Sequence, residues 1–344
     1  PANTHVIRHA NKIFALEEAH LPWIIDDDLN TIGYYDFNGM LKGPMTAHPR
    51  VCPETNELLF FGYRMMSKPY LMYYRVSPKG ELIQSEEIDL PRPVMMHDWN
   101  ITRNYVVFMD LPLVFDMDSA VRGDEPFGFK PEYGARLGVM PRNGSGKDIN
   151  WININPCFVF HPMNAYEQDN KIILHVCRQD KAMVGGMDQI YGGDETTGKL
   201  WKWTIDLKRQ SCSEEQIDDV ACDFARVDDR KIGLKADNGY VMELNNKAET
   251  LTFGNNLYKY DLNNGSREDH FLGDYVVGGE PLFAPNPDTK YENDGFVMSI
   301  VHDNKTNKSK LILIDSCNFE DKPIAEIILP QRVPFGAHGS WLEN

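Results

Sequence analysis

The sequence predicts an all-β protein in which many short strands are arranged around one axis. Segments rich in aromatic and β-branched residues recur along the whole chain of 344 residues, and turn-forming residues separate them. No long amphipathic helix interrupts this pattern, and only residues 214–219 are expected to form one helical turn. Short strands over this length favour a propeller, or several sandwiches, over a single barrel.

The clearest strands can be placed in chain order. They are expected at residues 57–63, 70–76, 105–110, 171–176, 296–301 and 310–314. Residues 1–7 also have a strand pattern, so the chain is expected to start inside a fold. Turns are expected at residues 77–80, 263–265 and 304–307. An aromatic-x-aromatic pattern followed by a polar turn occurs at residues 71–77, 200–206 and 257–262. We expect these three segments to be equivalent strands of different blades.

Composition and charge narrow the class of protein. With 42% apolar and 25% charged residues, the chain is expected to be an ordinary soluble globular protein, and at this length one large all-β domain over residues 1–344 is as plausible as two domains. The net charge of −16 and the lack of a Lys/Arg cluster argue against nucleic-acid binding. Six cysteines without paired spacing indicate free thiols in a reducing, cytoplasmic setting. No apolar run approaches the ~20 residues of a membrane-spanning helix.

Four histidines stand out because each lies in a distant and distinctive segment. They are His48, His97, His161 and His338. The gaps between them are 97−48 = 49, 161−97 = 64 and 338−161 = 177 residues, which no single helix or zinc-finger loop provides. Neutral imidazole is the commonest protein ligand for a catalytic transition metal. The pattern therefore predicts one metal site at which several strands converge.

The neighbours of these four histidines support that interpretation. His48 and His161 each precede a proline, which favours extended backbone. His97 ends an apolar run, and His338 lies between Gly336 and Gly339, where a bare backbone permits close approach. The remaining histidines lack such settings and are interpreted as structural or surface residues: His5, His9, His20, His175, His270 and His302.

Together with further stretches, these motifs resemble the carotenoid cleavage oxygenase family, which includes stilbene-cleaving dioxygenases and the retinoid isomerase of the eye. The matching stretches are residues 2–4, 15–18, 29–33, 36–39, 134–142, 227–230, 279–285 and 329–334. The resemblance implies a seven-bladed β-propeller with capping loops, and an iron(II) on its axis held by four histidines. Mapped onto this sequence, the implied ligands are His48, His97, His161 and His338.

The resemblance also implies glutamates that orient the ligand imidazoles. Glu18 and Glu280 match two of these positions, while Asp223 stands where the family has a third glutamate. Asp223 is one methylene shorter, so we expect its direct bond to an imidazole to be lost or bridged by water. Four neutral imidazoles leave the metal charge uncompensated, and carboxylates one step further out supply that compensation without occupying coordination positions.

Two departures from the family pattern affect what is expected. The family usually has a further segment before the Ala2-Asn3-Thr4 motif, so an N-terminal part of the propeller is expected to be missing. Stilbene-cleaving members carry a lysine that contacts the substrate phenol, and here that position is Glu17.

The expected function is cleavage of a conjugated C=C bond of a carotenoid or apocarotenoid by iron(II) and O2, giving two carbonyl products. The apolar substrate implies possible peripheral contact with a membrane. A phenolic stilbene is the alternative substrate, and a non-catalytic metal-binding propeller is the alternative class. Imidazole also suits zinc, copper and nickel, so iron comes from the resemblance alone.

Overall fold

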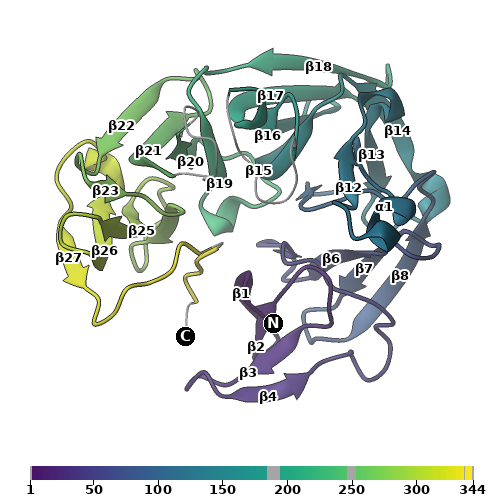
Figure 1. The fold of residues 1–344 in the computed structure, drawn as a ribbon, viewed down its shortest axis with the longest axis horizontal. Coiled ribbons are helices and arrows are strands. Elements are labelled where there is room, and N and C mark those ends of the chain that lie inside the picture. Colours follow the sequence, from purple (N-terminus) through teal and green to yellow (C-terminus); the bar gives the residue numbers. More distant parts are fainter. Residues whose placement is uncertain (1, 184–193, 246–252, 337, 343–344) are drawn as a thin grey trace.

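The computed structural model describes residues 2–183, 194–245, 253–336 and 338–342 as a ring of antiparallel sheets around a central axis (Figure 1). The first sheet contains β1 (His5–His9), β2 (Lys12–Leu16), β3 (Trp23–Ile25) and β4 (Thr31–Tyr34). The second contains β5 (Arg50–Val51), β6 (Leu58–Tyr63), β7 (Leu71–Val76) and β8 (Leu82–Ile88). The third contains β9 (Asn100–Ile101), β10 (Tyr105–Asp110), β13 (Ala135–Pro141) and β14 (Asn150–Ile154).

The remaining sheets follow in chain order. The fourth contains β15 (Phe158–Gln168), β16 (Lys171–Gln179), β17 (Lys199–Asp206) and β18 (Ser211–Gln216). The fifth contains β19 (Cys222–Arg226), β20 (Asn238–Leu244), β21 (Phe253–Asp261) and β22 (Arg267–Phe271). The sixth contains β23 (Val276–Val277), β24 (Leu282–Pro285), β25 (Gly295–Asp303), β26 (Lys308–Asp315) and β27 (Ala325–Ile328).

The all-β propeller architecture is therefore confirmed, but the expected seven blades are wrong for this chain. The described residues form six blade-like sheets of four or five strands. The number seven came from the family resemblance and not from a repeat in the sequence. A propeller blade takes roughly 40–50 residues. Six blades, together with the excursion of the chain between β10 and β13, therefore account for the 344 residues.

The individual strand predictions hold where aromatic and β-branched residues are dense. The three aromatic-x-aromatic segments lie in β7, β17 and β21, and each is the third strand of its sheet. The predicted helical turn at residues 214–219 is wrong, because residues 214–216 belong to β18 and pair with β17. β18 is the outer edge strand of its sheet, where charged residues are common and mimic a solvated helix.

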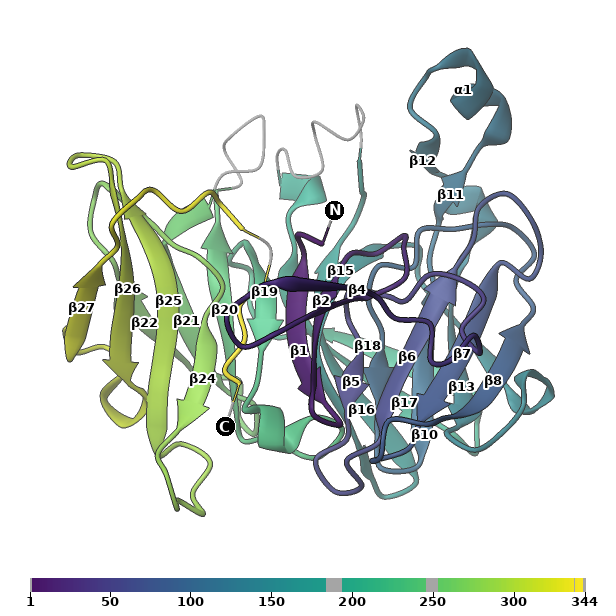
Figure 2. The same cartoon turned by 90° about the horizontal axis from the view of Figure 1, so that it is seen from below.

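One excursion leaves the ring between β10 and β13. It consists of β11 (Leu113–Phe115), α1 (Met117–Arg122) and β12 (Phe127–Phe129), and it projects from one end of the ring (Figure 2). The side chain of Asp116 caps the N-terminus of α1 by accepting a bond from Ser119 N, and Gly123 ends the helix with a φ of 77°. No helix among the described residues is long and apolar enough to cross a membrane.

The core fills the spaces between neighbouring sheets, where side chains from both faces of the strands are buried. The largest side chains with almost no exposure include Trp99, Trp203, Tyr73 and Phe108. All six cysteines are free thiols, as the sequence indicates. Among the described residues, short 3-10 helices lie in the connections at Pro131–Tyr133, Gly146–Asp148, Asp194–Thr196, Asp229–Lys231 and Ser316–Asn318.

The C-terminal segment leaves the sixth sheet after β27 and returns to the first sheet. The backbone N–H of His338 donates to Thr4 O at 3.1 Å, and the Ser340 hydroxyl donates to Val6 O. This return places His338 beside the start of β1 in the first sheet, and Figure 1 shows the C-terminal segment passing next to β1.

Candidate metal centre

Each of the six sheets contributes one polar side chain to the centre of the ring. Glu18 follows β2 in the first sheet, His48 precedes β5, and His97 precedes β9. His161 lies in β15, Asp223 lies in β19, and Glu280 precedes β24. The C-terminal segment adds His338. The four expected ligands and three expected orienting carboxylates therefore come from seven successive points around the ring.

Irregular backbone aims the side chains of the fourth and fifth sheets inward. The pairing of β15 with β16 shifts register on both sides of Pro162, next to His161. In β19 the register shifts between Asp223 and Arg226, and Phe224 adopts a positive φ of 56°. Such bulges re-aim side chains at the rim of a site. The Phe224 ring packs 4.8 Å from the His161 ring.

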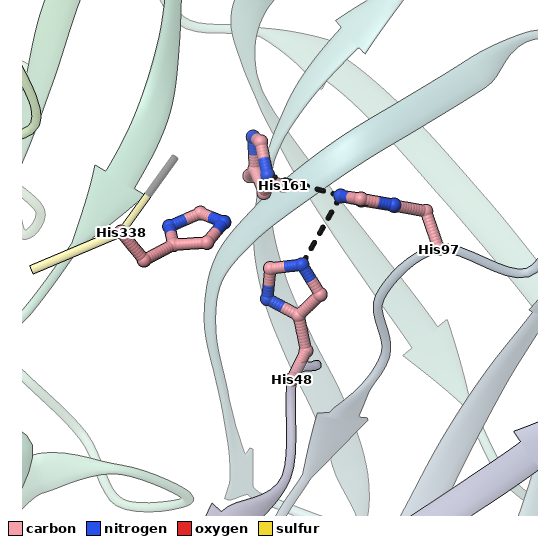
Figure 3. A group of neighbouring side chains, drawn as sticks. All are labelled: His48, His97, His161 and His338. Atoms are coloured by element: carbon pink, nitrogen blue, oxygen red, sulfur yellow. Dashed lines mark hydrogen bonds between the residues drawn. The ribbon is translucent and has the colours of Figure 1, made fainter. Parts of the chain in front are cut away.

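The four imidazoles converge on one point, as Figure 3 shows. Their ligand nitrogens all lie within 4.8 Å of one another. His97 Nε2 is 3.1 Å from His48 Nε2 and 3.2 Å from His161 Nε2. Two nitrogens about 2.1 Å from one ion and at right angles lie about 3.0 Å apart, so these spacings fit a single transition-metal ion. The cluster can therefore hold a metal.

The opposite ring nitrogens point to carboxylates. His97 Nδ1 donates to Glu18 Oε2 at 2.9 Å, and His338 Nδ1 donates to Glu280 Oε1 at 2.8 Å. These bonds fix the tautomer in which Nδ1 carries the proton and Nε2 presents a lone pair to the centre. Glu18 also accepts a bond from the Tyr63 hydroxyl.

The shorter Asp223 side chain keeps a direct bond to its histidine. His161 Nδ1 donates to Asp223 Oδ1 at 3.0 Å, so the expected loss or bridging of this bond by water is wrong. The same oxygen accepts from Phe224 N at 2.8 Å. The positive φ at Phe224 bends the strand toward the axis, which is consistent with the backbone making up for the missing methylene.

His48 also has a carboxylate beside its Nδ1, and sequence reasoning missed it. Asp98 Oδ2 lies 3.4 Å from His48 Nδ1, and Asp98 is 3% exposed. In the sequence Asp98 directly follows His97, so nothing in the pattern connects it with a histidine 50 residues earlier (98−48 = 50). Only the packing of β5 next to β9 reveals the pair.

The electrostatics of the cluster favour neutral imidazoles and ionised carboxylates. Burial lowers the pKa of His48 well below its usual range, and the neighbouring imidazoles add to that effect. Burial also lowers the pKa of His338. Burial alone would raise the pKa of Glu280, but Arg226 and His338 hold it well below its usual range. Neutral imidazole is the form that binds metal, and a carboxylate is the form that accepts its N–H.

His97 differs from these two histidines. Burial opposes its charge, yet the Glu18 carboxylate at its Nδ1 raises the pKa of His97 above its ordinary value. Glu18 itself is held ionised, because His97 and Tyr63 outweigh the effect of burial and lower the pKa of Glu18. Metal binding at Nε2 of His97 therefore competes with a proton.

A cavity of about 690 Å³ reaches the cluster from one side and is lined by His48, His161 and His338. His5 also lines it, with its ring centre 5.5 Å from that of His338. His5 Nδ1 donates to Ala47 O at 2.9 Å, and burial lowers the pKa of His5 to about 3. The interpretation of His5 as an ordinary structural or surface residue therefore misses its position beside the site.

The fold and this site can now be compared with known proteins. A family model described as retinal pigment epithelial membrane protein matches residues 1–343. The chain belongs to this family, that of the carotenoid cleavage oxygenases. The carotenoid cleavage oxygenase of Mycobacterium tuberculosis is 30% identical over 386 aligned residues, which cover 98% of this chain and 76% of that protein.

Other members of the family show the same likeness. The carotenoid 9,10(9',10')-cleavage dioxygenase 1 of Arabidopsis thaliana is 33% identical over 99% of this chain. The chain spans 66% of the length of that relative, or about two thirds. Among solved structures, the lignostilbene dioxygenase of Pseudomonas brassicacearum superposes with a TM-score of 0.91 at 31% identity, covering 100% of this chain and 75% of that one. The cobalt-substituted apocarotenoid oxygenase of Synechocystis superposes with a TM-score of 0.90 at 25% identity, with 100% and 74% covered.

Proposed function

We propose that this chain carries the metal centre of a non-haem iron(II) dioxygenase that uses O2 to cleave a conjugated C=C bond of a carotenoid or apocarotenoid into two carbonyl products. The observation that carries the proposal is the convergence of four Nε2 atoms, with three of the imidazoles hydrogen-bonded to a carboxylate at Nδ1. The proposed ligands are His48, His97, His161 and His338, and the proposed orienting carboxylates are Glu18, Asp223 and Glu280. The names of the relatives support the reaction class.

The donor set fits iron(II) without requiring it. Four neutral imidazoles around one ion leave coordination positions free, and imidazole suits iron as well as zinc, copper and nickel. When bound, iron would supply the activation of O2. The protein holds each imidazole in one tautomer and one direction, so that the ion is not displaced by a proton or pulled toward a carboxylate.

Aromatic side chains beside the cluster support an apolar substrate. The Phe224 ring lies 4.8 Å from His161 and 5.8 Å from His338. It continues to Phe253 at 5.4 Å, and Phe253 continues to Phe335 at 5.5 Å. This row leads from the proposed metal to a half-exposed phenylalanine. A polyene is bound through apolar contacts of this kind and needs no charged partner.

The outer end of the same row supports uptake from a lipid surface. Phe335 is 52% exposed, and Trp341 in the same C-terminal segment is 49% exposed. A carotenoid partitions into membranes, so we propose that a cytoplasmic protein touches the membrane peripherally here without spanning it. Binding to liposomes that is weakened by Phe335→Asp would support this contact.

The side chain of Glu17 argues against a phenolic substrate. His20 Nδ1 donates to Glu17 Oε2 at 2.5 Å, and a carboxylate thus stands where stilbene-cleaving members carry a lysine. A phenolate at this position would be repelled by the carboxylate. A stilbene nevertheless stays the alternative, because the lignostilbene dioxygenase superposes with a TM-score of 0.91 and the isoeugenol monooxygenase of Pseudomonas nitroreducens is 29% identical over 99% of the chain.

One experiment separates the candidates. The iron-loaded protein is incubated aerobically with an apocarotenal and with a hydroxystilbene, and the products are identified by mass after labelling with 18O2. We expect two labelled carbonyl fragments from the apocarotenal and a higher kcat/KM for it. A clear preference for the hydroxystilbene would transfer the assignment to the alternative. Binding of both compounds without any turnover would instead indicate a non-catalytic metal-binding propeller.

A further inference from the structure

We propose that Asp98 is a fourth carboxylate that orients a ligand imidazole, that of His48, and that Arg50 holds Asp98 in position. The inference rests on the proposed metal centre and assigns a residue that its three orienting carboxylates do not include. His48 and Asp98 are each 3% exposed, so no solvent competes for the His48 Nδ1 proton. Asp98 Oδ2 lies 3.4 Å from that nitrogen.

The two oxygens of Asp98 have separate partners. Oδ1 accepts from Arg50 Nη2 at 2.6 Å and from Trp99 N at 2.7 Å. Arg50 Nη2 also donates to Trp99 O at 3.0 Å, which locks the guanidinium to the same segment. Oδ2 is thereby turned toward His48. A carboxylate with one oxygen anchored by two donors is rigid, which is what an orienting partner requires.

The backbone of His48 is held by the same segment. Trp99 Nε1 donates to His48 O at 2.9 Å, and Trp99 is fully buried. Residues 98 and 99 therefore contact His48 at two points: Trp99 at its carbonyl oxygen and Asp98 beside its ring. The distance of 3.4 Å exceeds the 2.8–3.0 Å of the other three pairs. A ring movement of roughly 0.4 Å gives an ordinary N–H···O bond of about 3.0 Å.

The arginine partners reveal a charge pattern around the cluster. Arg50 pairs with Asp98, and Arg226 Nη1 lies 3.4 Å from Glu280 Oε2. Asp98 and Glu280 each have a guanidinium partner, so the charge of each carboxylate is partly balanced within the protein.

The first test replaces the carboxylate by its amide. In Asp98→Asn the side chain keeps its size and an acceptor for Trp99 N, but the anion beside His48 is lost. We expect the dissociation constant for Co2+, measured by chelator competition, to rise ~10–100-fold, as for loss of other orienting partners. Co2+ serves as a probe with an optical readout, so no turnover is needed.

A second variant separates positioning from support of the fold. Arg50→Gln removes the guanidinium but leaves the carboxylate, so the cluster becomes more negative. Trp99 N still anchors Asp98 Oδ1, so we expect Tm to fall and the affinity for Co2+ to weaken less than in Asp98→Asn. Equal loss of affinity in Asp98→Asn and Arg50→Gln would show that the ion pair only supports the fold, and would overturn the proposal.

A buried ion pair elsewhere provides the matched control. Asp110 is fully buried, accepts from Arg136 Nε at 2.7 Å and accepts from the Tyr133 hydroxyl at 2.8 Å. Asp110→Asn makes the same chemical change outside the histidine cluster. We expect it to lower Tm and to leave the affinity for Co2+ unchanged. A loss of affinity equal to that of Asp98→Asn would count against a specific role of Asp98.

The unaltered protein offers a measurement that needs no variant to fold. Bound Co2+ shifts the exchangeable Nδ1–H protons of its histidine ligands far from other resonances in proton NMR. We expect four such protons that exchange slowly with water, one for each imidazole held by a carboxylate. Three slow protons and one fast proton would show that His48 lacks its partner and would overturn the role of Asp98.

The outcomes also distinguish this inference from the function on which it rests. A wild-type protein that binds no Co2+ overturns the metal centre itself and Asp98 with it. A wild-type protein that binds Co2+ tightly, with unchanged affinity in Asp98→Asn, overturns the role of Asp98 alone and leaves the centre in place.

Discussion

The two ring nitrogens of each imidazole have different surroundings, and this makes the histidine cluster a candidate metal centre. Nε2 faces the centre, and Nδ1 faces a carboxylate in three of the four residues, at 2.8–3.0 Å. A histidine buried for packing alone has no need of either arrangement. His270 illustrates the contrast, because its Nδ1 donates to Phe319 O and its ring packs against Phe319.

This contrast leads to a prediction about metal content. Replacement of His48, His97, His161 or His338 by alanine should each reduce bound metal well below one ion per protein, because three imidazoles hold a divalent ion more weakly than four. His270→Ala, in which a buried histidine outside the cluster is lost, should retain full metal content. Elemental analysis of purified proteins checks this. Stoichiometric metal in all four cluster variants would contradict the site.

At the scale of single residues, sequence reasoning succeeded where a local signal exists. Proline after His48 and His161, and glycine around His338, are local and visible. The direct bond of Asp223 depends on a bulge at Phe224 that no propensity reveals. Asp98 could not be assigned either, because its partner His48 belongs to the neighbouring sheet.

At the scale of elements, each ligand is positioned by the strand that adjoins it. The loop that carries His48 is packed directly on β6. Thr46 N donates to Phe61 O at 2.8 Å, and a Cβ on Gly62 would lie only 2.0 Å from Pro44 O. The absence of a side chain at Gly62 therefore lets this loop pack closely against β6.

Gly62→Ala should consequently move the loop and His48 with it. We expect a loss of stability of about 1–3 kcal/mol, as for overpacking in general, together with weaker metal binding. Denaturant titration and metal competition measure both. Gly128→Ala in β12 is the control, since its Cβ would meet only the flexible end of Lys130 at 3.2 Å. Equal effects of the two variants would argue against a specific link between Gly62 and His48.

The connection between the fourth and fifth sheets contains a carboxylate whose contribution to stability depends on pH. Asp218 follows β18 and accepts bonds from Tyr260 in β21 at 2.9 Å and from Arg267 in β22 at 2.5 Å. Burial would raise the pKa of Asp218, but these hydrogen bonds outweigh it and the pKa is lowered. A carboxyl group whose pKa is lower in the folded than in the unfolded state stabilises the fold at pH values above its unfolded pKa of about 3.9.

Asp218→Asn should therefore be less stable than the wild type at pH 7, and the difference should shrink as the pH falls below about 4. Urea unfolding at several pH values measures it. Asp219→Asn, at the exposed neighbouring position, should show little difference at any pH. A gap between wild type and Asp218→Asn that widens in acid would refute the stated direction of the pKa shift.

At the scale of the whole molecule, the proposed ligands come from parts of the chain that are far apart. Three of the histidines belong to the second, third and fourth sheets, and the fourth belongs to the segment that returns to the first sheet (Figures 1 and 3). An ion bound as proposed would therefore act as a crosslink across the ring. An ion present at 100 times its dissociation constant stabilises the folded state by about 2.7 kcal/mol.

Removal of the metal with a chelator should lower Tm and should increase hydrogen exchange most strongly in residues 329–336 and 338–342. This segment has few backbone bonds to the sheets besides that of His338 N to Thr4 O, so its anchoring depends on the ligand bond. Hydrogen-exchange mass spectrometry with and without chelator measures the change. In His338→Ala the segment should exchange rapidly in both conditions, and a chelator effect that persists in this variant would disprove the explanation.

The all-β class was predictable because aromatic-rich strands and turns recur along the chain, and three of those strands occupy the same place in their sheets. This recurrence left a propeller and several sandwiches open, and the family resemblance favoured the propeller. The number of blades was not predictable, because the blades share spacing but not sequence. One inward side chain per sheet is a property of the assembled ring, and only the resemblance to a family indicated it beforehand.

The order of the ligands along the chain has a consequence for synthesis. The first three histidines are complete once residue 161 has been translated, and the fourth follows after 338−161 = 177 further residues. At translation rates of about 5–20 residues per second, the nascent protein spends about 9 to 35 s as a possible three-histidine site. Three imidazoles with an open position form a typical catalytic zinc site. We therefore expect zinc to compete for the proposed site on the ribosome, until the last sheets fold and His338 completes the set.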